Sequence, residues 1–277
     1  MLALIALCHG CFAPDVSSRV APASVSGIER MHGIDPRLST GSSPDSHGYR
    51  ELRALGVDIV LSVDGPPPPV DLIRELGMRS IHLPIGYDGV PPDVLRSLVR
   101  LAEEAPDSNL YVHCHQGRHR GPTVAAILLR LRGSGSVEDA SAILSVCGTS
   151  PEYVGLWASA EGFVVPEGDC RKAPLPERVE PDPLVLQMDR IQKLRDSLDD
   201  FASKAGSRSN ILLLKDAFVE LQRLHRPATA VELQSWDTDI DLTIKLLESL
   251  RAAPSFDSGD LARIDARCDS CHAASRH

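Results

Sequence analysis

The chain has 277 residues, 43% of them hydrophobic, and this length favours two compact domains over a single core. The formal charge of −9 and the lack of a long basic run in the sequence argue against nucleic acid as the main partner. No stretch of the sequence approaches the roughly 20 apolar residues of a membrane-spanning helix, so no membrane span is expected.

Residues 1–27 are predicted to be a leader that is similar to a secretory signal or disordered. The apolar start MLALIALCHGCFA is followed by a Pro- and Ser-rich segment without periodicity. The basic start of a secretory signal is missing, so a wrongly assigned start before a disordered segment is the alternative. Cys8 or Cys11 could carry a lipid, but the residues around them fit that pattern poorly.

Residues 28–165 are predicted to form an α/β domain with a mostly parallel sheet flanked by helices. Short apolar runs, typical of buried strands, alternate with segments of helical spacing that often end at glycine. The predicted strands are 58–63, 80–85 and 110–114, and the predicted helices are 48–56, 69–77, 91–105 and 121–132.

Residues 166–183 contain five prolines and many charges, which predicts a linker. Beyond it no strand pattern remains, and the spacing predicts an all-α four-helix bundle over 184–277. Its expected helices are 184–206, 210–225, 230–253 and 257–274. The seven cysteines of the chain are too few and too scattered for a disulfide framework.

Cys114 lies where a predicted strand meets a predicted helix, in the sequence HCHQGRHRG. Amide groups before a helix and a nearby arginine supply positive charge, which favours an ionised thiolate. The N–H groups of residues 115–120 would also bind a phosphate dianion, and the Arg120 fork would grip two phosphoryl oxygens. Gly117 allows the loop to turn tightly against the anion. These residues predict phosphoryl transfer through a cysteinyl-phosphate.

The sequence HCHQGRHRG resembles the H-C-x5-R loop of the cysteine-dependent protein tyrosine and dual-specificity phosphatases. The resemblance covers about residues 28–165, and the segment 25–44 is similar to the opening strands of small phosphatases of this type. It implies that Cys114 is the nucleophile, that Arg120 holds the phosphate and that His113 tunes the thiol. The substrate-binding residues would be His115, Gln116, Gly117, Arg118 and His119. A structural cysteine at a strand end is the alternative.

The leaving oxygen needs a proton, so a general acid is expected on a movable loop that faces Cys114. The segment 83–95 follows a predicted strand and contains glycine and proline. Asp88 matches the acid position of the resembled family best. Asp93 is the alternative, although its place after Pro91-Pro92 favours the first turn of a helix.

The loop departs from the resembled family directly after its arginine. The family has a Ser or Thr there, whose hydroxyl stabilises the departing thiolate; this chain has Gly121, and the nearest hydroxyl is that of Thr123. Attack on the substrate could therefore survive while hydrolysis of the phosphoenzyme is slow. A pseudophosphatase that only binds phosphorylated ligands is the alternative. Arg118, His115 and His119 of the loop favour an anionic substrate. A metal site formed by the two histidines is a weaker interpretation.

The second motif is C-D-S-C-H, with Cys268, Cys271 and His272. Its spacing allows both thiols to bond haem vinyl groups while the imidazole binds the iron. On the last helix of a bundle, the motif resembles the attachment site of cytochrome c′ and its low-spin relatives. This resemblance covers about residues 182–277 and implies covalent haem c. Half of a zinc site and a redox dithiol are the alternatives.

The resemblance implies that His272 is the proximal iron ligand. A second ligand would come from the first helix of the bundle, where Met188 has a suitable thioether. His225, near the end of the second helix, is a weaker candidate. Without such a ligand the iron would be five-coordinate. Covalent haem attachment requires export, so a periplasmic location is expected, or a cytoplasmic one if the haem interpretation fails.

Two functions follow from these motifs. The first is a phosphatase fused to a c-type haem module, acting on a phosphorylated protein or a small phosphomonoester. The second is an electron-transfer or sensor haem protein, with a possible redox partner, whose phosphatase-like half only binds phosphorylated ligands.

Overall fold

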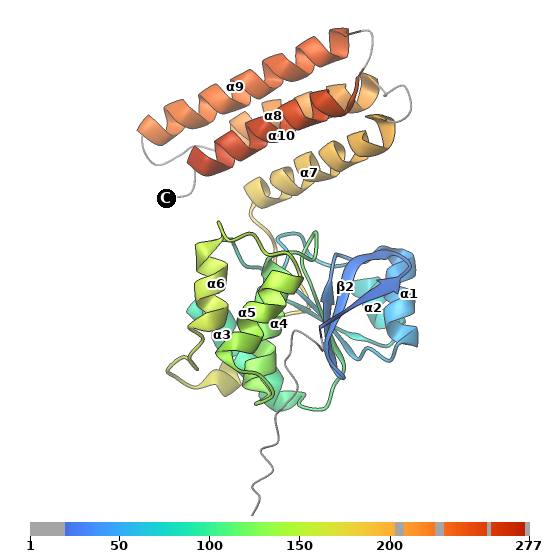
Figure 1. The fold of residues 1–277 in the computed structure, drawn as a ribbon, viewed down its shortest axis with the longest axis vertical. Coiled ribbons are helices and arrows are strands. Elements are labelled where there is room, and N and C mark those ends of the chain that lie inside the picture. Colours follow the sequence, from blue (N-terminus) through green and yellow to red (C-terminus); the bar gives the residue numbers. More distant parts are fainter. Residues whose placement is uncertain (1–19, 203–207, 225–229, 254–255, 275–277) are drawn as a thin grey trace, which may run out of the picture. The chain divides into compact units, whose positions relative to one another are not determined.

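The computed structural model describes residues 20–202, 208–224, 230–253 and 256–274. The chain divides into two compact units, the first ending at Glu180 and the second beginning at Pro181. Each unit is described below by itself (Figure 1). Within the described ranges, no helix combines the length and the hydropathy that crossing a bilayer requires.

The described part of the first unit contains a six-stranded sheet with the order β1-β2-β3-β6-β4-β5. The strands are β1 (Ala21–Val25), β2 (Ile28–Asp35), β3 (Leu38–Gly41), β4 (Ile59–Ser62), β5 (Arg79–His82) and β6 (Leu110–His113). The pairs β3–β6, β6–β4 and β4–β5 are parallel, and β1 and β2 join in antiparallel fashion at one edge. The predicted mostly parallel sheet is therefore confirmed.

Strand β1 lies inside the segment 1–27 that composition predicts to be a leader. It pairs with β2 as an edge hairpin that turns through Gly27, whose φ is 77°. A Cβ atom on Gly27 would lie 2.2 Å from Asp45 Oδ1, so the turn requires glycine. Four of the five β1 residues are exposed, which explains why the sequence has no hydrophobic alternation there. Cys8 and Cys11 lie outside the described residues.

Helices cover both faces of the sheet (Figure 1), as the alternation of buried side chains along its central strands requires. On one face Val60 and Tyr111 pack with α1 (Ser46–Ala54) and α2 (Val70–Glu75). On the other face Leu61 and Val112 pack with the larger group of helices. These are α3 (Pro92–Glu104), α4 (Arg120–Leu131), α5 (Val137–Val146) and α6 (Val154–Glu161).

Helices α5 and α6 were not expected from the sequence pattern. Helix α5 begins with a capping box, in which the Ser136 and Asp139 side chains each accept the other residue's backbone N–H. Both helices pack on α4 through small or aliphatic residues such as Ala140 and Leu156. Helix α4 is buried through residues 120–129, and this burial keeps it fixed at the centre of the unit.

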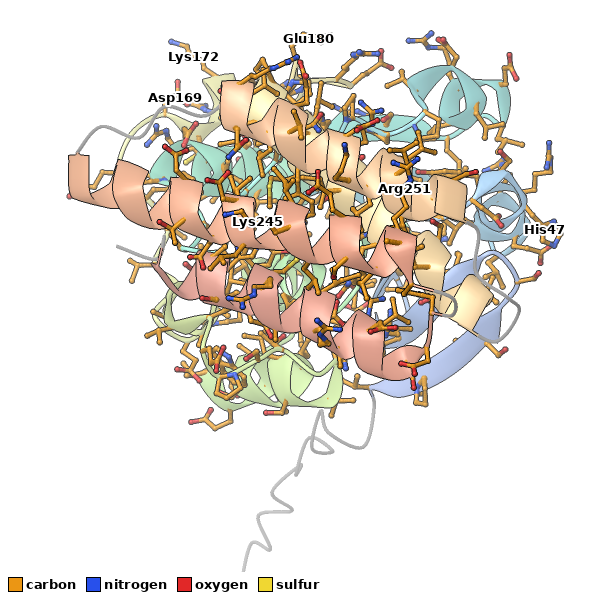
Figure 2. The ribbon with its side chains drawn as sticks, turned by 90° about the horizontal axis from the view of Figure 1, so that it is seen from above. His47, Asp169, Lys172, Glu180, Lys245 and Arg251 are labelled. Atoms are coloured by element: carbon orange, nitrogen blue, oxygen red, sulfur yellow. The ribbon has the colours of Figure 1, made fainter. Side chains whose placement is uncertain are left out.

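The segment predicted as a linker, 166–183, belongs largely to the first unit, which extends to Glu180. Cys170 and Ala173 are buried, and Asp169 lies 3.7 Å from Lys172 (Figure 2). The segment then runs along edge strand β5, where His82 N–H donates to Pro176 O at 2.8 Å. An edge strand left bare would expose unpaired backbone groups, and the residues around Pro176 cover them.

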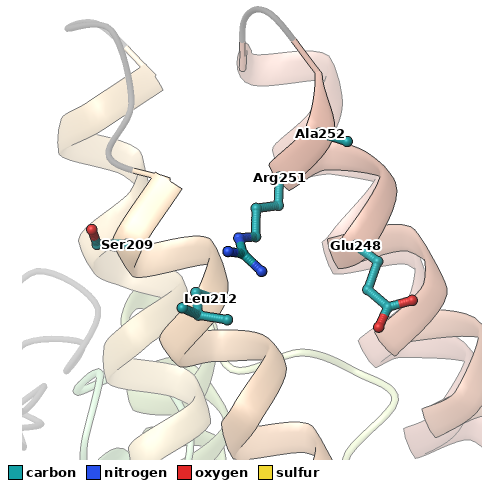
Figure 3. A pocket seen from close by; sticks show the side chains of 5 residues that line it. All are labelled: Ser209, Leu212, Glu248, Arg251 and Ala252. Atoms are coloured by element: carbon teal, nitrogen blue, oxygen red, sulfur yellow. The ribbon is translucent and has the colours of Figure 1, made fainter.

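The described part of the second unit consists of α7 (Pro183–Ala202), α8 (Arg208–Leu224), α9 (Ala230–Ala252) and α10 (Ser258–Ala274). The predicted bundle is confirmed, and its helices enclose a core of buried aliphatic residues and Phe218. Apolar residues three, four or seven apart face this core, as in Ile191 and Leu198 or Leu261 and Ile264. A hollow of about 580 Å³ lies between α8 and α9, with Arg251 and Glu248 at its α9 side (Figure 3).

Candidate active site

Cys114 lies directly after β6, at the carboxyl end of the middle of the sheet, and its side chain is buried. In the parallel register, Gly41 of β3 and Ser62 of β4 both stand opposite His113. Because parallel strands end at the same edge, the residues after β3 and β4 surround the loop 114–119. Helix α4 begins at Arg120, so the thiol lies before a helix N-terminus, where the partial charge is positive.

The backbone carbonyls of this loop are turned away from its centre, because groups around it donate hydrogen bonds to them. These bonds are Ser43 N–H to His115 O (3.0 Å), Arg30 Nη1 to Gln116 O (3.1 Å), Thr149 Oγ1 to Arg118 O (2.7 Å) and Thr123 Oγ1 to His119 O (3.0 Å). In a trans peptide the next N–H points opposite to the carbonyl. The N–H groups of residues 116, 117, 119 and 120 therefore point inward and can bind an anion.

Gly117 has a φ of 71°, in the left-handed region. A Cβ atom there would lie 2.3 Å from Gly41 C and 2.4 Å from Ser42 N, so the end of β3 leaves no room for a side chain. Glycine is thus required at this position, as the sequence predicts. The reason differs, because the loop approaches the end of β3 closely there rather than an anion. Because Gly117 has no side chain, the loop can lie directly against the sheet.

Arg120 is 8% exposed and its guanidinium is held on two sides. Nη2 donates to Asp64 Oδ1 at 2.8 Å, and Nη1 donates to Ile85 O at 3.4 Å. The Nε–H group, also buried, has no acceptor among the described residues. A buried donor of this kind is costly to leave unpaired. The guanidinium is therefore fixed at one end by Asp64 and keeps one unpaired donor, and its charge interacts with Cys114.

Asp64 is the first of several site residues that sequence reasoning missed. It follows β4 in the sequence VLSVDG, is 6% exposed, and also accepts the Gly65 N–H at 2.9 Å. His115 Nδ1 lies 4.0 Å from its carboxylate. An acidic residue just after an apolar parallel strand was the available signal, because such strand ends meet at the ligand-binding edge of a sheet.

An aromatic cluster borders the site. Tyr87 and Tyr153 stack with ring centroids 4.7 Å apart, and His119 lies 4.7 Å from the Tyr153 ring. The Arg120 guanidinium carbon lies 4.6 Å from the centre of the Tyr87 ring. Sequence reasoning named His119 but neither tyrosine, because the two come from distant segments that only the fold brings together.

The neighbouring groups keep the His119 ring neutral. Ser150 N–H donates to Nδ1 at 3.3 Å, so this nitrogen accepts a hydrogen bond. Burial, with the charges of Arg118, Arg120 and Arg30, lowers the pKa of His119 to about 4. Arg118 itself is exposed, and Gln116 and His115 are half-buried. Arg30, a further residue that the sequence did not indicate, has a φ of 49° in the left-handed region.

Asp88 lies on the loop between β5 and α3, next to Tyr87, and is exposed. The loop is fixed to α6, because Val90 N–H donates to Ser159 Oγ at 3.0 Å and a Cβ atom on Gly155 would lie 1.9 Å from Asp88 O. Asp93 lies in the first turn of α3, as its position after two prolines predicts. The acid role of Asp88 stays a prediction.

At Gly121, an added Cβ atom would lie 3.1 Å from Thr40 Oγ1 and 3.3 Å from Cys114 N. The Thr40 hydroxyl therefore occupies the space beside this position, and it donates to Val112 O at 2.8 Å. Thr123 Oγ1 donates to His119 O and is turned back toward the loop backbone. The hydroxyl that the resembled family places at this point is absent from position 121 in the described site.

The unfolding free energy is expected to fall as the pH is lowered from about 6.5 to 4. Burial lowers the pKa of His113 to about 4, and it is 1% exposed. Between pH 6.5 and 4, His113 binds a proton in the unfolded chain but not in the folded one. This residue therefore lowers the free energy of unfolding by up to about 3 kcal/mol at acid pH. Urea unfolding at several pH values measures this. His113→Gln should show a smaller pH dependence, and an unchanged one would contradict the prediction.

The C-x-x-C-H motif lies in the last turns of α10. Cys268 and Met188 both pack against the core of the bundle, from α10 and α7 respectively. Cys271 is half-buried and His272 is exposed. Burial raises the pKa of Cys268 to about 11, which disfavours the thiolate that a reactive dithiol needs. In the described ranges, no three His, Cys, Asp or Glu side chains gather as a metal site would require, and His225 lies outside those ranges.

No family model matches the sequence, and no curated protein matches it. Among solved structures, the chain is similar to TpbA of P. aeruginosa, with 20% identity over 53% of this chain and 92% of that one, and a TM-score of 0.45. Tk-PTP in its active form has 20% identity over 51% of this chain and 100% of that one, with a TM-score of 0.42. The kinase associated phosphatase has 18% identity over 46% and 84%, with a TM-score of 0.40.

Proposed function

We propose that the first unit is a phosphatase that hydrolyses phosphomonoesters through a cysteinyl-phosphate intermediate. One observation carries the proposal: a buried arginine, Arg120, begins the helix that follows a buried thiol, Cys114, is near enough for its charge to interact with that thiol, and keeps an unpaired Nε–H group. Buried polar groups are otherwise nearly always paired, so this donor favours an anionic ligand. The inward N–H groups of the loop add further donors for the same ligand.

In the proposed reaction, the Cys114 thiolate attacks phosphorus and the bond from phosphorus to the ester oxygen breaks. Asp88, in its acid form, gives its proton to that oxygen, so the alcohol leaves neutral. Water then attacks the cysteinyl-phosphate, gives a proton to the Asp88 carboxylate, and releases phosphate and the thiolate. Because position 121 has no hydroxyl for the departing thiolate, the second step is expected to be the slower one.

The aromatic cluster favours an aryl phosphate, such as a phosphotyrosine residue of a protein, as substrate. Tyr87 and Tyr153 present stacked rings next to Arg120, and a third ring could pack on them. Such a pair of rings contributes about 1 kcal/mol beyond the area it buries. A tyrosine-type activity is therefore the preferred form of the proposal, with dual specificity as the wider one.

Initial rates on matched phosphotyrosine and phosphoserine peptides test this function. The phosphotyrosine peptide should be preferred, and Tyr153→Ala should reduce that preference about fivefold, because one stacking contact is lost. Tyr49→Phe, which changes a buried tyrosine on the opposite face of the sheet, is the matched control. A wild-type chain that hydrolyses neither peptide, nor a small aryl phosphate, would overturn the proposal.

We further propose that the second unit binds haem c covalently. The Arg195–Asp265 ion pair joins α7 to α10, with Nε and Oδ1 2.6 Å apart, and these helices run in opposite directions (Figure 1). Met188 lies seven residues before Arg195 and His272 seven residues after Asp265. At a rise of about 1.5 Å per residue, both lie about 10 Å toward the same end of the bundle. The two donors therefore lie at the same level of the bundle, which supports binding of one group by both.

Cys268 and Cys271 would hold this haem covalently, and His272 and Met188 would bind its iron. When bound, such a group supplies one-electron transfer or binds a small gas molecule. The hollow near Arg251 is not part of this site. Ser270, within the C-x-x-C-H motif, has its Oγ 3.3 Å from Asp239 Oδ1 of α9, and Asp239 precedes the α9 residues that line the hollow by at least nine positions. Haem attachment would imply export of the chain, to the periplasm.

The haem proposal predicts a visible spectrum of c-type haem when the chain is produced in a host that matures cytochromes. Cys268→Ala with Cys271→Ala should abolish covalent haem, and Met188→Leu should convert a low-spin spectrum to a high-spin one. Cys170→Ala, in the first unit, is the control. Protein purified from that host without covalent haem would refute the proposal. It would also remove the alternative of a haem electron-transfer or sensor protein, and leave the phosphatase proposal unaffected.

A further inference from the structure

His82, the last residue of β5, is completely buried and takes part in none of the proposed chemistry. Burial lowers its pKa, so the ring stays neutral. Its backbone N–H donates to Pro176 O at 2.8 Å, and its ring contacts both Val179 and Asp64. Residues 176–179, called the strap from here on, therefore meet the loop after β4 through this one side chain.

The two hydrogen bonds of the ring fix its tautomer. Val179 N–H lies 3.0 Å from Nδ1, and a backbone amide can only donate, so Nδ1 accepts. Nε2 then carries the proton and donates to Asp64 O at 2.9 Å. The ring thus connects a strap donor to an acceptor on Asp64, and no other tautomer satisfies both partners.

Asp64 passes this constraint to Arg120. The His82 ring donates to the backbone carbonyl of Asp64. The Asp64 carboxylate accepts from Arg120 Nη2 at 2.8 Å and from the Gly65 N–H. The direction of the carboxylate depends on the backbone that His82 holds. The direction of the Arg120 fork, and with it of the unpaired Nε–H, depends on the carboxylate.

We propose that His82 is a positioning residue: it ties the strap at Val179 to Asp64 and thereby sets the pose in which Arg120 meets phosphate. The inference rests on the proposed function, because it concerns the same arginine. It assigns a role to residues at the end of the first unit that composition indicated only as a linker. His82 touches neither Arg120 nor Cys114 in this account and acts through Asp64 alone.

The test measures the affinity for orthophosphate by calorimetry in the full chain with Cys114→Ser. His82→Phe removes both ring bonds and should weaken binding about tenfold. His82→Gln keeps a donor for Asp64 O and should stay within about twofold of the parent. Val179→Pro removes the strap donor and should weaken binding, while Val179→Ala should not. Ser80→Ala loses only the strap bond to Glu177 O (3.3 Å) and is the matched control.

In the Asp64→Ala background, His82→Phe should change the affinity less than about twofold, because His82 acts through Asp64. A full loss in that background would overturn the inference, as would equal losses for the Gln and Phe variants. The ring nitrogens of His82 provide an independent reading, and an NMR spectrum of the Nδ1–H tautomer would also overturn it. If the parent bound no orthophosphate, the proposed function would fail first. An Arg120–Asp64 pair unchanged in crystals of His82→Phe would then reject the positioning role.

Discussion

Cys114→Ser is expected to lower the turnover of an aryl phosphate by about 10⁴-fold or more, while orthophosphate should still bind. A serine hydroxyl stays protonated near neutral pH and cannot replace a thiolate as the nucleophile. Binding persists because Arg120 and the inward N–H groups of the loop do not depend on the sulfur. Initial rates and calorimetry measure the two effects on the same preparations.

The control for this variant is Cys147→Ala, which changes another buried cysteine, at the end of α5 and outside the loop. It should keep a turnover within about threefold of wild type. A Cys114→Ser protein that retained about a tenth of the wild-type turnover would show that the sulfur is not the nucleophile. Loss of both turnover and binding would instead indicate that the loop had collapsed.

Arg120→Lys is expected to lower kcat/KM by about 10²- to 10³-fold. A lysine ammonium could still pair with the Asp64 carboxylate, so the fold should persist. It has no planar fork, however, and cannot pair with the carboxylate at one end while it donates to a phosphoryl oxygen from the other. The loss should appear in kcat as well as in KM, because charge on the phosphoryl oxygens is held throughout the reaction.

The matched control is Arg118→Lys, two residues away on the same loop but exposed. It should change kcat/KM by no more than about threefold, since the lysine keeps the positive charge at an exposed position where no fixed fork is needed. Equal losses for the two variants would contradict the special role of Arg120, because any change from arginine to lysine in the loop would then have the same effect. Thermal unfolding of both variants separates a lost contact from a lost fold.

The helical bundle could be predicted well from the sequence, because its residues meet one another through short-range periodic contacts. Ile191 and Leu198, or Leu261 and Ile264, repeat at helical spacing, and the observed helices agree closely with those expected. The C-x-x-C-H motif was equally local. How far along α10 Met188 lies, by contrast, follows from the Arg195–Asp265 pair between α7 and α10. The spacing of residues within one helix could not predict this alignment of two helices.

The N-terminal hairpin and the strap were harder to predict. Strand β1 is mostly exposed. The strap is held by two hydrogen bonds with His82, whose backbone N–H donates to Pro176 O and whose ring Nδ1 accepts from the Val179 N–H, rather than by buried apolar side chains. Hydrophobic periodicity, the signal that identified β4 and β6, is absent where backbone pairing alone fixes a segment.

The sequence by itself determined the loop that we propose as the nucleophilic one: a thiol, a tight turn at Gly117 and an arginine six residues after the cysteine, between an apolar strand and an apolar helix. These residues are neighbours in the chain, so their meeting required no knowledge of the fold. Only the tertiary structure brought Asp64, Tyr87 and Tyr153 to that loop and connected His82 to it. Parallel strands end at one edge of the sheet, and this geometry gathers residues that lie far apart in the sequence.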